Sequence, residues 1–349
     1  MKTLLIITSD YEPNIGGIAV DTVRLFKLLK RKHSVDLAAF GINGDNSEGE
    51  TFIDAKKIFF PYHLKKIISR KKYDAILVRT VLPLGWMLNL IKTDAKKISF
   101  VYGQELLHDE KQKHFFRPSV RSIIKKSDRV VVNSKFTNSL IDNSGFLFYP
   151  LIENVECGER TERNFFKIIT AGRFVKHKNF ISMIRIIDRA DAEVFKKTKK
   201  HVKLEIYGDG PLRKDYDDFI VRNNLSDNVS VCGRIESGKM NPVYASSDII
   251  AMPSIKTNES VEGFGMVAQE AGLCGSVCIG YDSGGIRESI EDNELLADEN
   301  DEEKLLNIII RLLTDNNFYE AKQKFSRERA KKHLAGEERL KDFDEILSF

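Results

Sequence analysis

The stretch Asn258–Ala271, NESVEGFGMVAQEA, begins as a polar loop, turns through two glycines and predicts a helix from Met266 onward. Glu262 precedes the turn, and Glu270 lies inside the expected helix. Glycine lets the backbone approach a ligand closely, and the first N–H groups of a helix have no partner inside it. Together with the positive end of the helix dipole, these groups form a site for an anion.

The two glutamates of this stretch suit a ligand that carries hydroxyl groups at both ends. A carboxylate accepts hydrogen bonds, so Glu270 can bind the hydroxyls of a ribose and Glu262 those of a sugar. The pattern therefore favours a nucleotide diphosphate joined to a second hydroxylated group. The alternative is an ordinary surface helix with two solvated glutamates, and this segment alone leaves both interpretations open.

The length of the chain predicts two domains, because 349 residues exceed what one hydrophobic core usually holds. A composition of 42% hydrophobic and 30% charged residues is typical of a globular protein. The apolar runs are no longer than strands, which predicts no membrane span. The opening MKTLLIITSD becomes polar too soon for a secretory signal, so we expect a buried first strand and a cytoplasmic protein.

The four cysteines, Cys157, Cys232, Cys274 and Cys278, lack the paired spacing of metal ligands. In a cytoplasmic protein we expect them to be reduced thiols. We expect Cys274 and Cys278 to pack in or beside the end of a helix.

The net charge of +4 conceals an asymmetry between the two halves of the chain. Residues 1–150 contain 25 Lys and Arg against 15 Asp and Glu, and the remaining residues contain 30 against 36. A basic first half indicates an anionic partner. The sequence has no zinc pattern, helix-turn-helix signature or aromatic RNA-binding run, so we expect an anionic membrane surface or a phosphorylated acceptor and no nucleic acid.

Residues 1–150 predict an N-terminal doubly wound α/β domain, because strand-like and helical patterns alternate along them. The expected strands are Leu4–Thr8, Val35–Phe40, Ala75–Val78, Ile98–Tyr102 and Arg129–Val132, and a helix is expected near Ala19–Arg31. Ligands of such domains gather at the carboxyl ends of the strands. That edge would carry Ser9–Gly17, Arg79-Thr80, Gly103-Gln104-Glu105 and Asn133-Ser134.

Two segments mix aromatic residues with Lys and Arg: Ile58–Lys72 (IFFPYHLKKIISRKK) and Lys111–Lys126 (KQKHFFRPSVRSIIKK). Helices that lie in a membrane interface have this composition. The alternative is that each is an amphipathic helix whose apolar face packs on the sheet. As interfacial helices, they would hold the protein only weakly on anionic lipid.

Pro150–Arg163 is polar and without periodicity, which predicts a linker. A second α/β alternation follows, so we expect a C-terminal domain over residues 164–330. Its expected strands are Phe165–Thr170, Val202–Tyr207, Val229–Cys232, Ile249–Met252 and Val277–Ile279. Glu302–Phe349 is expected to be helical throughout, with residues 331–349 crossing back to the N-terminal domain.

The motifs together resemble the retaining glycosyltransferases of family four, which have the GT-B fold of two Rossmann-like doubly wound domains facing a central cleft. The resemblance covers nearly the whole chain. It rests on five segments in order: EPNIGGIAV (Glu12–Val20), VYGQELL (Val101–Leu107), AGRFVKHKN (Ala171–Asn179), IYGDGPLR (Ile206–Arg213) and EGFGMVAQE (Glu262–Glu270), the last in the E-x7-E pattern of the family.

The resemblance implies a metal-independent site for a nucleotide-sugar donor. Arg173 and Lys178 would neutralise the leaving diphosphate, and Glu262 would steady the sugar. The donor would further contact Gly16, Gly17, Gly208, Arg234, Ile235, Phe264, Gly265, Met266, Val267 and Glu270. No other cofactor and no metal site is expected.

The acceptor side would contain Asp10, Tyr102 and Glu105. Asp10 or Glu105 would act as a base or as an anchor for hydroxyl groups. Tyr102 stands where the family usually has histidine, and tyrosine donates a hydrogen bond but carries no positive charge near pH 7. A role for Tyr102 in neutralising phosphate is therefore in question.

The expected function is transfer of a hexosyl unit, with retention, from a UDP- or GDP-sugar to a lipid-linked or polysaccharide acceptor in surface glycan assembly. The expected location is cytoplasmic, with peripheral contact to the membrane. Two alternatives are a sugar-nucleotide 2-epimerase, which needs no acceptor, and a non-catalytic protein that binds sugar nucleotides.

Overall fold

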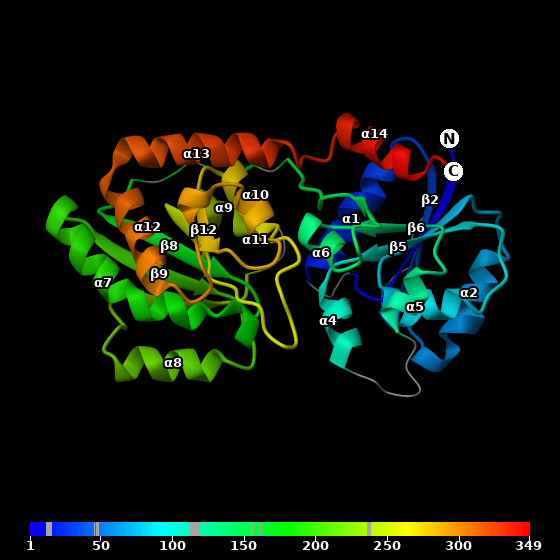
Figure 1. Cartoon of the computed structure of the whole chain (residues 1–349), viewed down its shortest axis with the longest axis horizontal. Helices are drawn as coiled ribbons and strands as arrows, with labels where there is room; N and C mark the ends of the chain where they lie inside the picture. Colours follow the sequence, from blue (N-terminus) through cyan, green and yellow to red (C-terminus); the bar gives the residue numbers. More distant parts are fainter. Residues whose placement is uncertain are drawn as a thin grey trace. The chain divides into compact units, whose positions relative to one another are not determined.

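The computed structural model describes residues 1–11, 16–44, 46, 49–111, 119–154, 156–158, 160, 162–235 and 239–349, without the side chains of 108–111. The chain divides into two units. Unit 1 comprises Met1–Glu153 and Leu334–Phe349, and unit 2 comprises Asn154–His333. Each unit is a parallel β-sheet with helices packed against it (Figure 1).

The sheet of unit 1 has the strand order β3-β2-β1-β4-β5-β6-β7, and its described strand pairs are all parallel. Its central strands form because their apolar runs are buried on both faces, as a parallel sheet covered by helices requires. The bounds are β1 Thr3–Thr8, β2 Ser34–Phe40, β3 Glu50–Ile53, β4 Ala75–Val78, β5 Lys96–Val101, β6 Arg129–Val132 and β7 Phe146–Leu147.

The helices of unit 1 include one from the end of the chain. They are α1 Gly17–Lys30, α2 Phe60–Ile68, α3 Trp86–Leu88, α4 Gln104–Lys111, α5 Val120–Ile124, α6 Lys135–Ser139 and α14 Glu337–Ile346, with short turns η1 Lys57–Phe59 and η2 Val81–Gly85. Phe343 of α14 is fully buried, and its ring centroid lies 5.1 Å from that of Phe148 and 6.2 Å from that of Phe100. The aromatic contacts fix α14 to the core of unit 1.

The sheet of unit 2 has the strand order β10-β9-β8-β11-β12-β13. Its strands are β8 Phe165–Ala171, β9 His201–Tyr207, β10 Val229–Gly233, β11 Ile249–Met252, β12 Val277–Tyr281 and β13 Leu296–Ala297. The helices are α7 Phe180–Thr198, α8 Arg213–Arg222, α9 Met240–Ala245, α10 Val267–Leu273, α11 Ile286–Ile290, α12 Glu302–Thr314 and α13 Asn316–Lys331, with turns η3 Lys176–Lys178 and η4 Asn293–Leu295.

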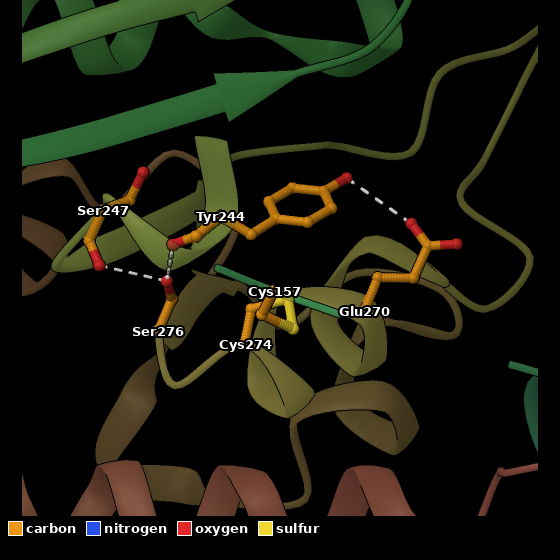
Figure 2. Close-up of a disulfide and its surroundings, with 6 residues drawn as sticks. All are labelled: Cys157, Tyr244, Ser247, Glu270, Cys274 and Ser276. Atoms are coloured by element: carbon orange, nitrogen blue, oxygen red, sulfur yellow. Dashed lines mark hydrogen bonds between the residues drawn. A yellow bond between two sulfur atoms is a disulfide. The ribbon is translucent and has the colours of Figure 1, made fainter. Parts of the chain in front are cut away.

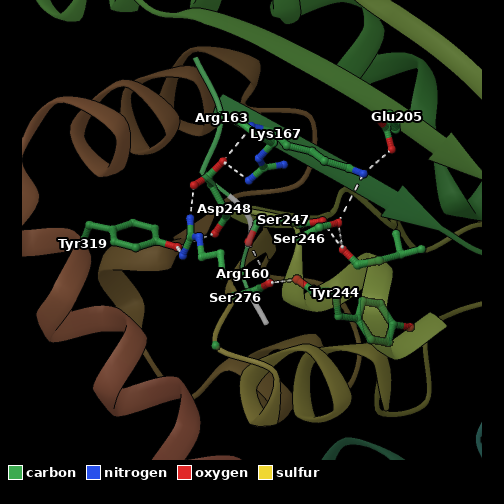
Figure 3. Close-up of polar contacts among 12 residues, drawn as sticks. Arg160, Arg163, Lys167, Glu205, Tyr244, Ser246, Ser247, Asp248, Ser276 and Tyr319 are labelled. Atoms are coloured by element: carbon green, nitrogen blue, oxygen red, sulfur yellow. Dashed lines mark hydrogen bonds and ion pairs between the residues drawn. The ribbon is translucent and has the colours of Figure 1, made fainter. Parts of the chain in front are cut away.

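A charged cluster stands at the start of β8 and β11 (Figure 3). Asp248 accepts the N–H of Lys167 at 2.6 Å and forms ion pairs with Arg160 and Arg163. Tyr319 of α13 donates to the backbone carbonyl of Asp248 at 3.1 Å. The cluster therefore anchors the segment that leads into unit 2 at the amino edge of the sheet.

The prediction of two doubly wound α/β domains is confirmed. The end of the chain differs from the expectation of continuous helix, because three helices occupy it. Asp315 separates the first two with an extended backbone, and its side chain accepts the N–H of Phe318 as the N-cap of α13. A second break covers residues 332–336 before α14.

The expectation of four reduced thiols is wrong, because Cys157 and Cys274 form a disulfide across 117 residues of sequence (Figure 2). Cys157 lies in the segment that leads into unit 2, and Cys274 caps the C-terminal end of α10. Cys232 is an exposed free thiol and Cys278 a buried one. The spacing could not reveal the pair, because folding brings the two residues together.

The basic segment Ile58–Lys72 forms η1 and α2. Phe60, Leu64 and Ile67 are buried, so one face packs on the core of unit 1 as the amphipathic alternative requires. Of the second basic segment, residues 112–118 lie outside the described residues, and Val120–Ile124 forms α5. Among the described helices, none combines the length and the apolar character needed to cross a membrane.

Candidate active site

Three loops meet at the carboxyl edge of the unit 2 sheet. The N–H of Gly172 donates to the carbonyl of Tyr207 at 3.0 Å, and the N–H of Gly208 donates to that of Gly233 at 2.8 Å. Gly208 has φ +136°, and a Cβ atom there would lie 1.9 Å from the carbonyl oxygen of Gly172. Only glycine allows this approach. Gly208 thus joins the loops after β8 and β9, which is a structural role beside the predicted contact with a donor.

An ion pair connects two of the predicted catalytic residues. Lys178, at the end of η3, places its Nζ 2.5 Å from Oε2 of Glu262. Their side chains are 19% and 16% exposed, so the pair lies largely out of water. Burial alone would raise the pKa of Glu262, but Lys178, His177 and the hydroxyl of Ser254 outweigh it and lower this pKa below its ordinary value of 4.5. Glu262 is therefore ionised near neutral pH.

His177 precedes the lysine of this pair and is partly buried. Burial and the positive charge of Lys178 lower its pKa, although Glu262 acts in the opposite direction. The imidazole is therefore neutral near pH 7. Its backbone carbonyl accepts the N–H of Ile255 at 2.8 Å, which joins the loop after β8 to the loop after β11.

The glycine turn after Glu262 is held by backbone contacts. The N–H of Gly285 donates to the carbonyl of Glu262 at 2.8 Å. Gly265 has φ +88°, a left-handed conformation that favours glycine. Helix α10 then begins at Val267, one residue after the predicted start at Met266, so its first N–H groups follow the turn directly.

Phe264 differs from its neighbours in the turn, because its side chain is only 2% exposed. Its ring centroid lies 5.3 Å from that of His333. The side chain is thus part of the packing of unit 2, and only backbone atoms of Phe264 remain suitable for the predicted donor contact.

Glu270 lies on α10 and is partly buried. The hydroxyl of Tyr244, on α9, donates to its Oε2 at 3.4 Å, which is a long hydrogen bond (Figure 2). Tyr244 itself is 3% exposed. A buried tyrosine therefore supports the carboxylate from one side.

The two predicted arginines are exposed. Arg173 follows β8 after one residue, Gly172, and its positive charge helps to lower the pKa of His177. Arg234 follows β10 with a side chain that is 76% exposed, and its Nε lies 4.0 Å from Oδ2 of Asp209. Ile235 is partly buried beside it. The arginines at this edge can thus meet a ligand without a large desolvation cost.

Unit 1 contains the other predicted residues, and residues 12–15 of its glycine loop lie outside the described residues. Gly16 caps α1 and Gly17 begins it. A Cβ atom at Gly16 would lie 3.4 Å from Oδ2 of Asp10, so this carboxylate lies close to the start of the helix. Burial raises the pKa of Asp10 above 3.8.

Tyr102 and Glu105 are close neighbours after β5. Glu105 accepts the N–H of Tyr102 at 2.7 Å, and burial raises its pKa although backbone N–H groups oppose the change. The hydroxyl of Tyr102 is buried and has no hydrogen-bond partner among the residues that the structure describes. Glu105 thus orders the loop, whereas the hydroxyl of Tyr102 remains able to bind a ligand.

Residues 158–332 match the family model described as Glycosyl transferases group 1. This span is half of the chain and contains the predicted residues from Arg173 to Glu270. The chain belongs to this family. The prediction that it is a glycosyltransferase is therefore confirmed.

Similar proteins support the same assignment over most of this glycosyltransferase. An uncharacterized glycosyltransferase of Methanocaldococcus jannaschii is 27% identical, with 94% of this chain and 95% of the relative covered. A GDP-mannose-dependent monoacylated alpha-(1-6)-phosphatidylinositol monomannoside mannosyltransferase of Corynebacterium glutamicum is 25% identical, with 90% and 89% covered. The crystal structure of Anabaena HepE in complex with UDP-glucose has a TM-score of 0.77 at 14% identity, with both chains fully covered. The last comparison shows the fold alone, which is GT-B.

Sequence reasoning expected Arg79 only as part of the ligand edge, and it missed Tyr244 and Arg329, which position the predicted site of the glycosyltransferase. Arg79 is buried, forms an ion pair with Asp21 and donates to the hydroxyl of Thr22, which fixes α1 next to β4. Tyr244 and Arg329 act similarly around α10. An arginine inside an apolar run, as at Arg79, is a usable signal, but Tyr244 and Arg329 lie in sequences without one.

A cavity of about 720 Å³ in unit 2 lies apart from the residues of the candidate active site. Phe165, Thr198, Asp248 and Tyr319 line it. Phe165 begins β8, and Asp248 immediately precedes β11, so the cavity lies at the amino edge of the sheet. The candidate active site occupies the carboxyl edge, which is where parallel α/β sheets bind their ligands.

Proposed function

We propose that this glycosyltransferase transfers a hexosyl unit from a UDP- or GDP-sugar to a lipid-linked or polysaccharide acceptor with retention of configuration. The observation that best supports this proposal is the partly buried ion pair of Lys178 and Glu262 beside the Gly265 turn. It places one cation and one ionised carboxylate next to the start of a helix. A departing phosphate and a sugar that develops positive charge require these two charges.

The donor has a proposed position along the three loops. Lys178 and Arg173 would contact the diphosphate, and Glu270 would bind the ribose. A nucleotide diphosphate donor is supported by the GDP-mannose dependence of the Corynebacterium relative and by the UDP-glucose in the HepE complex. We propose contacts with the base for Arg234 and Ile235, which adjoin the same edge.

In the proposed reaction, the bond between sugar C1 and the phosphate oxygen breaks while the acceptor oxygen bonds to C1 on the same face. The acceptor proton passes to the departing phosphate oxygen, so charge and atoms balance. Lys178 and Arg173 stabilise the negative charge on the phosphate. Glu262, kept ionised by its surroundings, stabilises the positive charge that develops on the sugar.

Asp10, Tyr102 and Glu105 are proposed to serve the acceptor. The hydroxyl of Tyr102, which has no partner in the described part of the chain, can donate to an acceptor hydroxyl or phosphate oxygen. Burial raises the pKa of Asp10, which makes its carboxylate a better proton acceptor than an ordinary aspartate, so Asp10 can act as a base or as an anchor for a hydroxyl group. Glu105 would support both through the loop that it orders.

Transfer differs from epimerisation in its need for an acceptor. Free nucleoside diphosphate should accumulate when donor and acceptor are mixed, and the sugar should appear on the acceptor with its anomeric configuration retained in the NMR spectrum. EDTA should leave the rate unchanged, because cationic side chains take the place of a metal. Release of nucleotide without acceptor together with formation of the 2-epimer, or an inverted product, would contradict the proposal.

An acceptor in a membrane is supported by a surface on unit 1, which we name the α2 patch. Ile58, Phe59 and Tyr62 are 78%, 55% and 66% exposed, and Lys65 and Lys66 follow them on α2. Exposed apolar side chains next to lysines suit an anionic lipid surface. Each basic residue contributes about 1 kcal/mol near such a surface, so the attachment would be peripheral and reversible.

Sedimentation with vesicles tests the α2 patch. The wild type should bind vesicles that contain anionic lipid, bind neutral vesicles poorly, and dissociate as salt screens the charges. Lys65→Ser with Lys66→Ser should weaken this binding, whereas Lys196→Ser with Lys197→Ser on α7 should not. Lys71 is unsuitable for the test, because it pairs with Asp36 at 3.1 Å. Absence of vesicle binding at low salt would rule out the membrane proposal.

A further inference from the structure

The disulfide between Cys157 and Cys274 lies one helical turn from the candidate ribose-binding residue. The N–H of Cys274 donates to the backbone carbonyl of Glu270 at 3.3 Å, at the end of α10. The other sulfur belongs to Cys157, 117 residues earlier in the sequence. The bond therefore ties the end of the helix that carries Glu270 to the first residues of unit 2, before β8.

A series of hydrogen bonds links the region of this disulfide to the carboxylate of Glu270 (Figure 2). Two residues after Cys274, the hydroxyl of Ser276 donates to the backbone carbonyls of Tyr244 and Ser247 at 2.5 and 3.0 Å. The side chain of Tyr244 in turn donates to Oε2 of Glu270. A shift of Cys274 would therefore move both the backbone and the side-chain support of Glu270.

The rest of α10 is held independently of the disulfide. Arg329 of α13 donates to the carbonyl of Ala268 at 3.0 Å and to the side chain of Gln269 at 3.1 Å. A Cβ atom at Gly272 would lie 2.7 Å from the carbonyl oxygen of Ser326, so the helix and α13 are in close contact. Opening of the disulfide would thus leave α10 in place and remove one tie at its C-terminal end, where Gln323 of α13 also donates to the carbonyl of Gly275 at 2.6 Å.

The two cysteine residues differ in exposure to solvent. Cys274 is 8% exposed, whereas Cys157 is only partly buried. A reductant thiolate would therefore attack Sγ of Cys157, break the S–S bond and release Cys274 as a thiolate that takes up a proton. With a dithiol, the second thiol then displaces Cys157 as a thiol. The protein disulfide gains two electrons, and the dithiol becomes a cyclic disulfide.

We propose that Cys157 and Cys274 form a thiol-sensitive brace of the donor site, which strengthens nucleotide binding when oxidised and weakens it when reduced. This inference rests on the proposed role of Glu270 in binding the donor ribose. Because the brace acts on a binding residue and leaves Lys178 and Glu262 untouched, reduction should raise the Kd of the nucleotide while kcat changes little.

Calorimetry with GDP and UDP tests the brace in the full-length protein. The oxidised protein should bind one of them about five-fold or more tightly than protein reduced with dithiothreitol, while alkylation and mass spectrometry count the thiols. Cys157→Ser should bind the nucleotide as weakly as the reduced protein does, and dithiothreitol should not change its affinity. Cys232→Ser, which removes the exposed free thiol, should respond as the wild type does.

Several outcomes would overturn the brace. Equal affinity of oxidised and reduced protein would do so, provided that alkylation shows the bond opened, and so would free thiols at Cys157 and Cys274 before reduction. Glu270→Ala separates the two hypotheses. If this change weakens binding but reduction does not, only the brace fails; if the wild type binds neither nucleotide, the proposed function fails with it.

Discussion

We propose that the pairing of Lys178 with Glu262 gives the two glutamates of the E-x7-E pattern distinct roles. Glu262 is matched with a cation in a site that is largely shielded from water, whereas Glu270 faces a tyrosine hydroxyl. A charge beside the reacting carbon acts on the transition state. A carboxylate that holds the ribose acts on the substrate before and during the reaction alike.

Substitution of the two glutamates should therefore separate kcat from KM. Glu262→Gln should lower kcat by about 10²- to 10³-fold, because it removes charge stabilisation in the transition state. Glu270→Gln should mainly raise the KM of the donor. Steady-state kinetics with donor as the varied substrate measures both. Two variants with the same pattern in kcat and KM would contradict the division of roles.

The same pair makes stability depend on pH. The unfolded chain protonates Glu262 near pH 4.5, and the folded chain does so at lower pH, because its pKa is lowered. The contribution of its charge to the free energy of unfolding is thus complete above the unfolded pKa and is lost as the pH falls through the folded pKa. Urea unfolding between about pH 3 and pH 7 should show the wild type converging toward Glu262→Gln at low pH. A gap that stays constant over this range would argue against an ionised Glu262.

The sequence identified Arg173, Lys178 and Glu262 as candidates, because each stands in a motif after a strand. The sequence could not predict the contact between Lys178 and Glu262. Lys178 and Glu262 lie 84 residues apart, and no spacing rule connects side chains at that distance. Phe264 illustrates the converse, since a residue inside the motif has its side chain in the core.

Among the elements, α10 is the one on which the site depends. It is seven residues long, so its position comes from packing on α13 more than from its own stability. Arg329 is 1% exposed and also donates to the carbonyl of Ile290 on α11, at 2.5 Å. One guanidinium group thus binds three acceptors on two helices.

Loss of this guanidinium should destabilise unit 2. Arg329→Met removes a guanidinium that donates to three buried acceptors, so the free energy of unfolding should fall by about 3 kcal/mol or more. The exposed Arg327 on the same helix is a matched control, and Arg327→Met should stay within about 0.5 kcal/mol of the wild type. Chemical denaturation measures both. Equal stabilities of the two variants would show that Arg329 does not hold the helices.

Most strands could be predicted, because the sequence of a buried parallel strand is a continuous apolar run. β3 was missed as well, because it is a four-residue edge strand that is mostly half-buried. β7 and β13 were missed because each has only two residues, too few for any pattern. The break at Asp315 was missed as well, although an aspartate is a common N-cap. Its signal was hidden by strong helical periodicity on both sides.

Across the whole molecule, two units with parallel sheets contain different parts of the predicted site. Unit 2 contains the proposed donor residues other than Gly16 and Gly17, and unit 1 contains the proposed acceptor residues. The last helix belongs to unit 1, where Asp344 pairs with Lys32 and His33. Arg129 also donates to the carbonyl of Ile346 at 2.9 Å, which adds a contact near the end of the chain.

The central claim is that the carboxyl edge of unit 2 binds the nucleoside diphosphate of a sugar donor. Calorimetric titration of GDP and UDP into the wild type, Glu270→Ala, Lys178→Ala and Lys176→Ala tests it most directly. One nucleotide should bind the wild type and the exposed-lysine control Lys176→Ala equally, and bind the other two variants about ten-fold or more weakly, a loss of about 1.4 kcal/mol. Binding of neither nucleotide, or equal binding to all four proteins, would contradict the account.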